Sequence, residues 1–385
     1  MPGSEKTTIY INHLYIMSKI YHLDAPNAGR IEKKYLTKAI DSGYISTFGP
    51  FVGQFEKKFA KFLGAKKAVA LQSGTAALHM SLLEAGIGDG DEVIVPCLTF
   101  VATVNPVLYV GAKPVLADVS PDTWNIQPEE IESHITTKTK AIIPVHLFGT
   151  CCDMGRIMEI AQKYNLVVIE DSTESLGVSF KGKQTGMFGN FGCFSFNGNK
   201  LITTGGGGMI VSEDEKKIEH IRFLINQAAD KNRSYYHPEI GFNYRMTNIE
   251  AALGLAQLER INSFLDKKRK FTKIYQQILG VLPYVEFQKQ YTQAQGARWL
   301  NCMVIKKKID IDSFIRQLKK KNIQTRRIFL PVSEMPYLRG PARKYPNSYG
   351  IYKNGICLPS STINSSDEIK EAALQVRETL EHFRQ

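Results

Sequence analysis

The chain has few cysteines, and none of them is spaced as a metal-binding or redox pair. Six cysteines occur in 385 residues, with no CxxC pair and no metal-finger spacing, a density far below that of a disulfide scaffold. An HExxH motif is absent, and the eight histidines do not cluster at the spacing of metal ligands. We therefore expect reduced thiols, a cytoplasmic location and no bound metal.

The sequence also lacks long apolar runs and low-complexity linkers. No uninterrupted run reaches the roughly 20 apolar residues that cross a bilayer, and the N-terminal segment has neither the apolar core nor the cleavage pattern of a signal peptide. We expect neither secretion nor membrane insertion. The first twenty residues have no assigned role.

Acidic residues are fewer than basic ones, since 37 Asp and Glu against 49 Lys and Arg give a net charge of +12. Such a balance suits phosphorylated ligands and could suit nucleic acid. The basic residues are scattered or grouped on what we predict to be solvated helix faces, and neither a zinc finger nor an RNP-like motif is present. Nucleic acid is therefore not the expected partner.

What is present is an ordinary globular composition, with 43% hydrophobic and 22% charged residues. A length of 385 residues exceeds what one hydrophobic core usually organises. Short, nearly all-apolar runs alternate with helix-compatible segments, as expected for parallel strands covered by helices on both faces. These runs begin at Ala68, Glu92, Lys113, Ala141 and Leu166.

The pattern predicts an α/β fold in which a large, mostly parallel sheet domain is followed by a smaller α+β C-terminal domain. Phe51, Phe55, Phe59 and Phe62 recur at helical spacing and stop at Gly64, which predicts a packing helix. After position 190, FGCFSF and GMIVS lie too close together for an intervening helix, so we expect a hairpin. One long helical pattern, 247–279, should lead out of the large domain.

The remaining residues complete the predicted organisation. Two strand candidates, RWLNCMVIKK and NIQTRRIFL, flank the helix candidate IDSFIRQLKKK. We predict an N-terminal extension at 1–26, a large domain at 27–260 and a small domain at 261–385.

Polar segments follow several of the apolar runs, at the strand ends where open parallel sheets bind ligands. SGTAAL, which starts at Ser73, places small residues at a helix start that could attract a phosphate, although a plain capped helix would look the same. Asp171 ends LVVIED and could pair with a protonated ring nitrogen, or could cap the next segment.

Lys200 is the most informative candidate. It lies in FSFNGNKLITTGGGGM, on a glycine-punctuated turn between two strands and among neighbours that are mostly apolar or uncharged. Desolvation lowers the pKa of an amine and favours Schiff-base chemistry. A solvated surface lysine is the ordinary alternative. The segment is not a P-loop, because GNK lacks the order GK[ST] and the glycine cluster leads into a strand.

These motifs, in this order, resemble the fold-type I pyridoxal-phosphate transferases. More narrowly, the chain is similar to the sugar aminotransferases of the DegT/DnrJ/EryC1/StrS family from about Asn27 to its C-terminus. The segments that carry the resemblance are GDEVIVP, TFVAT, the EDxxxxLG segment at Glu170, FSFNGNK and GFNYRMTNIEAALGLAQL.

The resemblance implies the cofactor pyridoxal 5′-phosphate and a role for each matching residue. Lys200 would bond to the cofactor and move the proton, and Asp171 would pair with the pyridine nitrogen. Phe100 would stack on the ring. Phosphate ligands would be Gly74, Thr75 and Ser195. Asn243 would reach the phosphate of the neighbouring subunit's cofactor, which implies a homodimer with shared sites.

Glu174 stands where many relatives carry His or Gln near the phenolic oxygen of the cofactor. A carboxylate there would repel an oxyanion unless it were protonated or paired, so its role stays open. Candidates to face the substrate are Ser46, Thr47, Arg245, Arg326 and Arg327. The last two could bind a diphosphate or could be surface charge.

The expected activity is transfer of an amino group, with glutamate as the donor, to a nucleotide-linked 4-keto-6-deoxy sugar. The phrase GNKLITTGGGGM is most similar to the branch that acts on UDP-linked hexosamines. A GDP-4-keto-6-deoxymannose 4-aminotransferase of the perosamine synthase type is the alternative. A non-catalytic cofactor-binding regulator and a sugar dehydratase are two others, and the dehydratase branch carries histidine at the position of Lys200.

Overall fold

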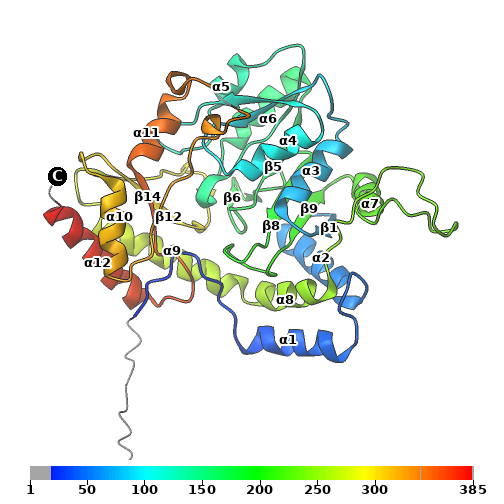
Figure 1. The fold of residues 1–385 in the computed structure, drawn as a ribbon, viewed down its shortest axis with the longest axis horizontal. Coiled ribbons are helices and arrows are strands. Elements are labelled where there is room, and N and C mark those ends of the chain that lie inside the picture. Colours follow the sequence, from blue (N-terminus) through cyan, green and yellow to red (C-terminus); the bar gives the residue numbers. More distant parts are fainter. Residues whose placement is uncertain (1–18, 339, 384–385) are drawn as a thin grey trace, which may run out of the picture.

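The computed structural model describes residues 19–338 and 340–383. Residues 1–18, most of the predicted N-terminal extension, lie outside the described residues. The described chain forms a large layered α/β part, built around one sheet, and a smaller α+β part beside it (Figure 1).

The large part is organised by a seven-stranded sheet with the order β1-β9-β8-β5-β4-β2-β3. Only β9 runs antiparallel to its neighbours, β1 and β8, and the other pairings are parallel. A strand forms at each of the five predicted apolar runs, and the predicted hairpin is β8–β9. The strands are β1 (Lys67–Leu71), β2 (Glu92–Pro96), β3 (Lys113–Ala117), β4 (Thr139–Ile142), β5 (Val167–Asp171), β8 (Phe191–Ser195) and β9 (Gly208–Ser212).

Helices cover both faces of this sheet (Figure 1). The predicted phenylalanine helix is α2, in which Phe55 and Phe59 are fully buried and pack on Phe196 with ring centroids 5.1 and 5.3 Å apart. It ends at Gly64, whose φ of +77° suits glycine. The helices are α1 (Arg30–Asp41), α2 (Pro50–Leu63), α3 (Gly74–Glu84), α4 (Asn105–Tyr109), α5 (Pro128–Ser133), α6 (Met154–Tyr164), α7 (Glu215–Leu224) and α8 (Asn248–Glu259).

The expected single long helix at 247–279 is wrong, because two helices occupy this segment. Helix α8 ends at Glu259, and α9 (Ile261–Ile278) begins two residues later, after a break at Arg260. The guanidinium of Arg260 donates to Glu32 Oε1 at 2.8 Å and to the carbonyl of Asn27 at 3.0 Å. These side-chain contacts are long-range, so the helical period alone did not reveal the break.

The smaller part is built on a four-stranded antiparallel sheet with the order β10-β12-β14-β13. The two predicted strands are present but shorter than predicted, and β14 was not predicted. Its elements are β10 (Val285–Phe287), β12 (Asn301–Ile305), α10 (Ile311–Lys320), β13 (Arg326–Arg327), α11 (Pro346–Asn354), β14 (Gly355–Leu358) and α12 (Ser366–His382). A third sheet joins β11 (Ala294–Gln295) to β6 (Ser179–Phe180) and β7 (Lys183–Gln184). The domain boundaries proposed above stay predictions.

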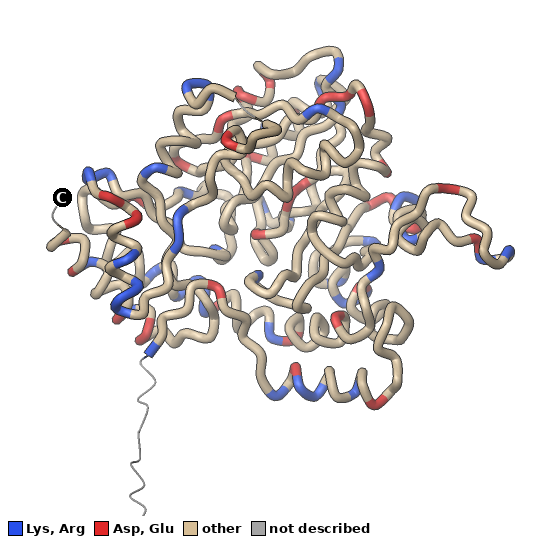
Figure 2. Tube along the Cα trace, in the orientation of Figure 1, with Lys and Arg blue, Asp and Glu red and all other residues tan. Residues whose placement is uncertain are grey.

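Charged residues are distributed over many elements rather than gathered in one place (Figure 2). In the described ranges, no helix is long and apolar enough to cross a membrane. Within those same residues, no group of three or more His, Cys, Asp or Glu side chains is placed to hold a metal ion.

Lys268, on α9, gives a testable consequence of burial. Its ammonium donates to the carbonyls of Trp299 and Ser360, and burial lowers the pKa of Lys268 from 10.5 to about 7. Between these two values the unfolded chain binds more protons than the folded one, so this lysine makes the protein more stable as pH rises. Replacing Lys268 by methionine removes this contribution to the pH dependence of stability. The stability of Lys268→Met relative to the parent should therefore be higher at pH 6 than at pH 9, by about 2–3 kcal/mol.

Urea unfolding of both proteins at the two pH values measures this difference. Lys270→Met, which removes an exposed lysine two positions away on the same helix, is the control. Its stability relative to the parent should be the same at pH 6 and pH 9. An equal pH dependence for Lys268→Met and the parent would contradict the assignment.

Candidate active site

A cavity of about 410 Å³ opens at the carboxyl ends of β5 and β8 and at the start of α3. Three side chains from the smaller part of the fold, Trp299, Arg326 and Phe329, also line it. Its lining includes Gln72, Ser73, Gly74, Thr75, Thr99, Phe100, Thr103, Asp171, Thr173, Glu174, Ser195, Asn197, Asn199, Lys200, Trp299, Arg326 and Phe329. The structure thus brings together most of the residues singled out in the sequence.

The start of α3 forms one side of the cavity. Ser73 caps this helix, because its Oγ accepts a hydrogen bond from the amide of Ala76 at 3.0 Å. A Cβ on Gly74 would lie 2.9 Å from Cβ of Ser195 and 3.0 Å from Cγ2 of Thr173. The capped-helix interpretation is therefore correct, and the same helix start also faces the cavity, where its dipole favours an anion.

Asp171 lies at the end of β5 and is buried. Its Oδ2 accepts a hydrogen bond from Oγ1 of Thr103 at 2.7 Å, and its Oδ1 accepts one from the amide of Thr173 at 3.2 Å. No helix begins at the next residues, so Asp171 is not a helix cap. A buried carboxylate with two neutral donors still has lone pairs to offer a cationic ligand in the cavity.

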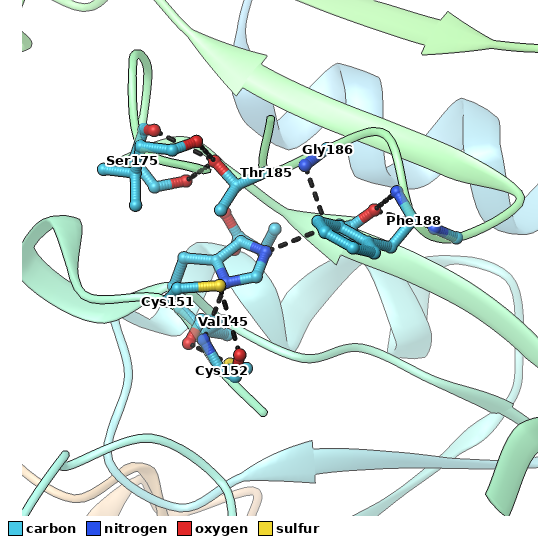
Figure 3. A network of polar contacts seen from close by, with 12 residues as sticks. Val145, Cys151, Cys152, Ser175, Thr185, Gly186 and Phe188 are labelled. Atoms are coloured by element: carbon cyan, nitrogen blue, oxygen red, sulfur yellow. Dashed lines mark hydrogen bonds and ion pairs between the residues drawn. The ribbon is translucent and has the colours of Figure 1, made fainter. Parts of the chain in front are cut away.

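A buried polar network fixes the strand end that carries Asp171. The preceding residue, Glu170, accepts hydrogen bonds from the amides of Gly186 at 2.8 Å and Phe188 at 2.6 Å, and from His146 Nε2 at 3.0 Å (Figure 3). The other imidazole nitrogen accepts from the amide of Cys152 at 3.1 Å, so Nε2 carries the proton. Two loops, one with His146 and one with Gly186 and Phe188, are therefore both hydrogen-bonded to the carboxylate of Glu170.

Lys200 lies in the turn after β8, with its side chain 14% exposed. Its Nζ is 3.4 Å from Oε1 of Glu174 and 4.1 Å from the centre of the Trp299 ring. Glu174 is buried, and its other oxygen accepts from the amide of Phe148 at 2.8 Å. Burial raises the pKa of Glu174, whereas the charge of Lys200 acts in the opposite direction. Glu174 is thus a buried partner of the lysine.

Aromatic rings form another part of the cavity wall. Phe100 is 55% exposed, although it lines the cavity, and its ring centroid is 5.6 Å from that of Phe329. Phe329 stacks in turn on Phe148 at 5.2 Å. An exposed ring at the mouth of a cavity can stack on a flat ligand.

The remaining sequence candidates lie in different places. Arg326 lines the cavity, but its neighbour Arg327 pairs with Asp312 at 2.6 Å instead and is not among the lining residues. Thr47 and Arg245 line a second, smaller cavity of about 280 Å³, and Ser46 and Asn243 are exposed. The cavity of a single chain therefore holds only one of the five substrate candidates.

Sequence reasoning missed several residues that the structure brings to the site. Thr103 contacts Asp171, and Trp299 covers Lys200. Thr103 lies within the TFVAT motif, so its hydroxyl was visible next to the predicted strand end. Trp299 lies about 100 residues after the lysine, and nothing in its local sequence indicates which helix or loop it meets.

Such a site, with a lysine, a strand-end aspartate and a small-residue helix start around one cavity, fits pyridoxal phosphate. The close approach of Gly74, Ser195 and Thr173 leaves a narrow cradle for a phosphate, and the buried Asp171 suits a ring nitrogen. The class of protein defined by this fold and site is a fold-type I transferase that depends on pyridoxal phosphate.

Comparison with known proteins identifies the family. The DegT/DnrJ/EryC1/StrS aminotransferase family model matches residues 26–377, so the chain belongs to that family. It is 40% identical over 380 residues to EpsN of Bacillus subtilis, which carries the name of a pyridoxal phosphate-dependent aminotransferase, covering 95% of this chain and 98% of EpsN. It is 43% identical over 343 residues to the GDP-perosamine synthase of Caulobacter vibrioides, covering 87% of this chain and 92% of that enzyme.

Solved structures agree with this assignment. PseC of Helicobacter pylori, an aminotransferase involved in the biosynthesis of pseudoaminic acid, superposes with a TM-score of 0.88 at 26% identity, covering 95% of this chain and 100% of PseC. The PLP form of the sugar aminotransferase Spr1654 of Streptococcus pneumoniae gives a TM-score of 0.89 at 26% identity, covering 94% and 99%. The protein is a pyridoxal phosphate-dependent nucleotide-sugar aminotransferase.

Gly74→Ala tests the cradle. The added methyl group would overlap Ser195 and Thr173, and the resulting displacement should weaken cofactor binding about tenfold or more. Titration of cofactor-free protein with pyridoxal phosphate measures the affinity. A Cβ at Gly53, an exposed position of α2, would meet no atom within 4 Å, so Gly53→Ala should leave the affinity unchanged. Equal affinities for the two variants would show that the cradle is elsewhere.

Proposed function

We propose that the protein transfers the amino group of glutamate to the 4-keto group of a UDP-linked 4-keto-6-deoxy-hexosamine. The observation that carries this proposal is the cavity in which Lys200, Asp171 and Arg326 meet, within a chain of this sugar aminotransferase family. The GNKLITTGGGGM segment that follows β8 supports the UDP-hexosamine branch, because it is similar to that branch in sequence.

A GDP-linked 4-keto-6-deoxymannose is the second candidate substrate. Three GDP-perosamine synthases are 37–43% identical to this chain over most of its length. The two candidates differ in base and in the substituent at C2, and both present a 4-keto group to the same lysine.

Each site residue has a proposed role. Lys200 would hold the cofactor and would move the proton at the sugar carbon, since its side chain lines the cavity. Pyridoxal phosphate supplies an electron sink for the carbon that bears the transferred nitrogen. Asp171 would pair with the ring nitrogen and keep it protonated, and Phe100 would lie against the ring. The phosphate is held by Gly74, Thr75 and Ser195.

Glu174 is proposed to hold a proton between itself and Lys200. Its burial favours the neutral carboxyl, and its contact with the lysine at 3.4 Å favours the ion pair. A carboxyl group that is neutral or paired with Lys200 can lie beside the phenolic oxygen of the cofactor without repelling it. Retention of Lys200 favours transamination over the dehydratase chemistry of histidine-bearing relatives.

The proposed assembly is a homodimer with shared active sites. Asn243 does not line the cavity of its own chain, and the segment after α7 that leads to it projects from the body of the molecule (Figure 1). This segment exposes Tyr235 and Ile240, at 99% and 86%, which a second copy could cover. Ser46, Thr47 and Arg245 are proposed to face substrate in that dimer, whereas Arg327 is not, because it pairs with Asp312 outside the cavity.

A cytoplasmic location belongs to the same proposal. The six cysteines are all free and buried, as expected in a reducing compartment. No nucleic-acid or membrane partner is proposed.

A panel of UDP-, GDP- and dTDP-linked 4-keto-6-deoxy sugars tests the substrate. The purified enzyme, with glutamate, should convert the UDP-linked hexosamine to a 4-amino product, identified by mass, faster than the other members of the panel. Faster conversion of the GDP-linked mannose would assign the second candidate. Faster conversion of the dTDP-linked sugar than of the other two would contradict both.

A further inference from the structure

The segment that precedes α1 is fixed to the smaller part of the fold. The amide of Tyr21 donates to the carbonyl of Asn322 at 3.0 Å, and its carbonyl accepts from Gln324 at 3.1 Å. The carbonyl of Leu23 accepts from the amide of Ser360 at 2.8 Å. These backbone contacts, which lie just before Asp24, hold the position from which this residue presents its side chain.

The carboxylate of Asp24 contacts two residues of the cavity wall. Its Oδ2 accepts a hydrogen bond from Nδ2 of Asn199 at 3.2 Å and one from Nη1 of Arg326 at 3.0 Å. Its side chain is 21% exposed. Asp24 is not among the lining residues, so it acts on the cavity through these two neighbours.

Both neighbours are connected to Lys200, Asn199 through the chain and Arg326 through the ring of Trp299. Asn199 immediately precedes Lys200, and its carbonyl accepts a hydrogen bond from Nε1 of Trp299 at 2.7 Å. The Trp299 ring lies 4.1 Å from Nζ of Lys200 and 5.6 Å from Cζ of Arg326. One carboxylate outside the cavity thus joins the lysine turn, the aromatic wall and the arginine.

Arg326 has a second carboxylate within electrostatic reach, namely Glu174, the partner of Lys200. Burial raises the pKa of Glu174 and is the largest effect on it, whereas the charge of Arg326 acts to lower that pKa. If Asp24 lost its charge, Glu174 would become the competing partner for the guanidinium. The contact between Lys200 and Glu174 would weaken as a result.

We propose that Asp24 is a positioning residue that holds Asn199 and Arg326, so that Lys200 keeps its place between Glu174 and Trp299. The segment before α1 is then part of the active site of its own chain. Asp24 precedes residues 26–377, which match the family model, so the family assignment does not supply this role.

The test compares two aspartates that pair with consecutive arginines. Asp24→Asn keeps the shape and an oxygen for Asn199 but removes the charge that faces Arg326. Asp312→Asn does the same to the pair with Arg327, outside the cavity. The loaded enzyme is mixed with glutamate, and the change of cofactor absorbance gives the rate and the half-saturating concentration. The parent is measured first: if it does not react with glutamate, the proposed donor is wrong, and another amino acid that it accepts is used.

Asp24→Asn should lower the maximal rate about tenfold, because small displacements of a reacting group are costly, whereas Asp312→Asn should stay within twofold. The absorbance of the lysine-bound cofactor should also titrate at lower pH in Asp24→Asn, since one negative charge near the site is lost. A purely structural role would move neither the pH of this titration nor the rate at fixed cofactor content. Asp24→Asn behaving like Asp312→Asn in both measurements overturns the proposal.

Asn199→Ala, and the double variant that combines it with Asp24→Asn, complete a double-mutant cycle. The test then does not depend on a single variant. If Asp24 acts partly through Asn199, the effects of the two changes on the rate should not be additive. Asp24→Ser, with a smaller acceptor, replaces Asp24→Asn should that variant be insoluble, and should show the same two changes. Full additivity together with an unshifted titration would exclude the proposed linkage.

Discussion

Replacing Lys200 by methionine is expected to lower the rate of amino transfer at least about a thousandfold, equivalent to ~4 kcal/mol of transition-state stabilisation. Methionine has a similar length but no amine, so it can neither bond to the cofactor nor carry a proton. The cofactor should still bind, because other residues are proposed to hold its phosphate and its ring. Its spectrum should be that of the free aldehyde.

Product formation by mass and the absorbance of the loaded variant measure the two effects. Lys183→Met, which removes an exposed lysine on β7, is the matched control and should keep the parent rate and spectrum. More than a tenth of the parent rate in Lys200→Met would mean that another group performs the proton transfer.

Asp171→Asn is expected to lower the rate about a hundredfold to a thousandfold, equivalent to ~3–4 kcal/mol. Asparagine retains the size of the side chain and can still accept from Thr103, which lies 2.7 Å away. It lacks the negative charge that would keep a ring nitrogen protonated, so the ring withdraws electrons less effectively. Single-turnover reaction with glutamate isolates this step from binding of the sugar.

Asp153→Asn provides the control, because Asp153 caps α6 and does not line the cavity. It should change stability by about 1 kcal/mol or less and leave the rate unaltered. If Asp171→Asn also kept the parent rate, the strand-end carboxylate would not be the partner of the ring.

The sequence was sufficient to predict the central sheet and the residues at its carboxyl edge. Nearly all-apolar runs specify buried parallel strands, and polar residues that directly follow them, such as Asp171, must emerge at one edge. Ser73 and Gly74 could be predicted for the same reason, since a helix that follows a parallel strand begins at the carboxyl edge of the sheet. Local sequence therefore determines this half of the site.

The other half depends on contacts between distant segments, which periodicity does not encode. Trp299 meets Lys200, and Asp24 meets Arg326, across about 100 and 300 residues respectively. Arg326 and Arg327 look alike in the sequence, yet β13 presents one to the cavity and the other to Asp312. The break at Arg260 likewise depends on Glu32, far away in the chain.

Reduction of the loaded enzyme with borohydride, followed by peptide mapping, tests the central claim most directly. The account predicts that the pyridoxyl group is fixed on the peptide that contains Lys200, at one group per chain, and that Lys200→Met carries none. A pyridoxyl group on any other lysine, or no stable adduct on the parent enzyme, would contradict the account.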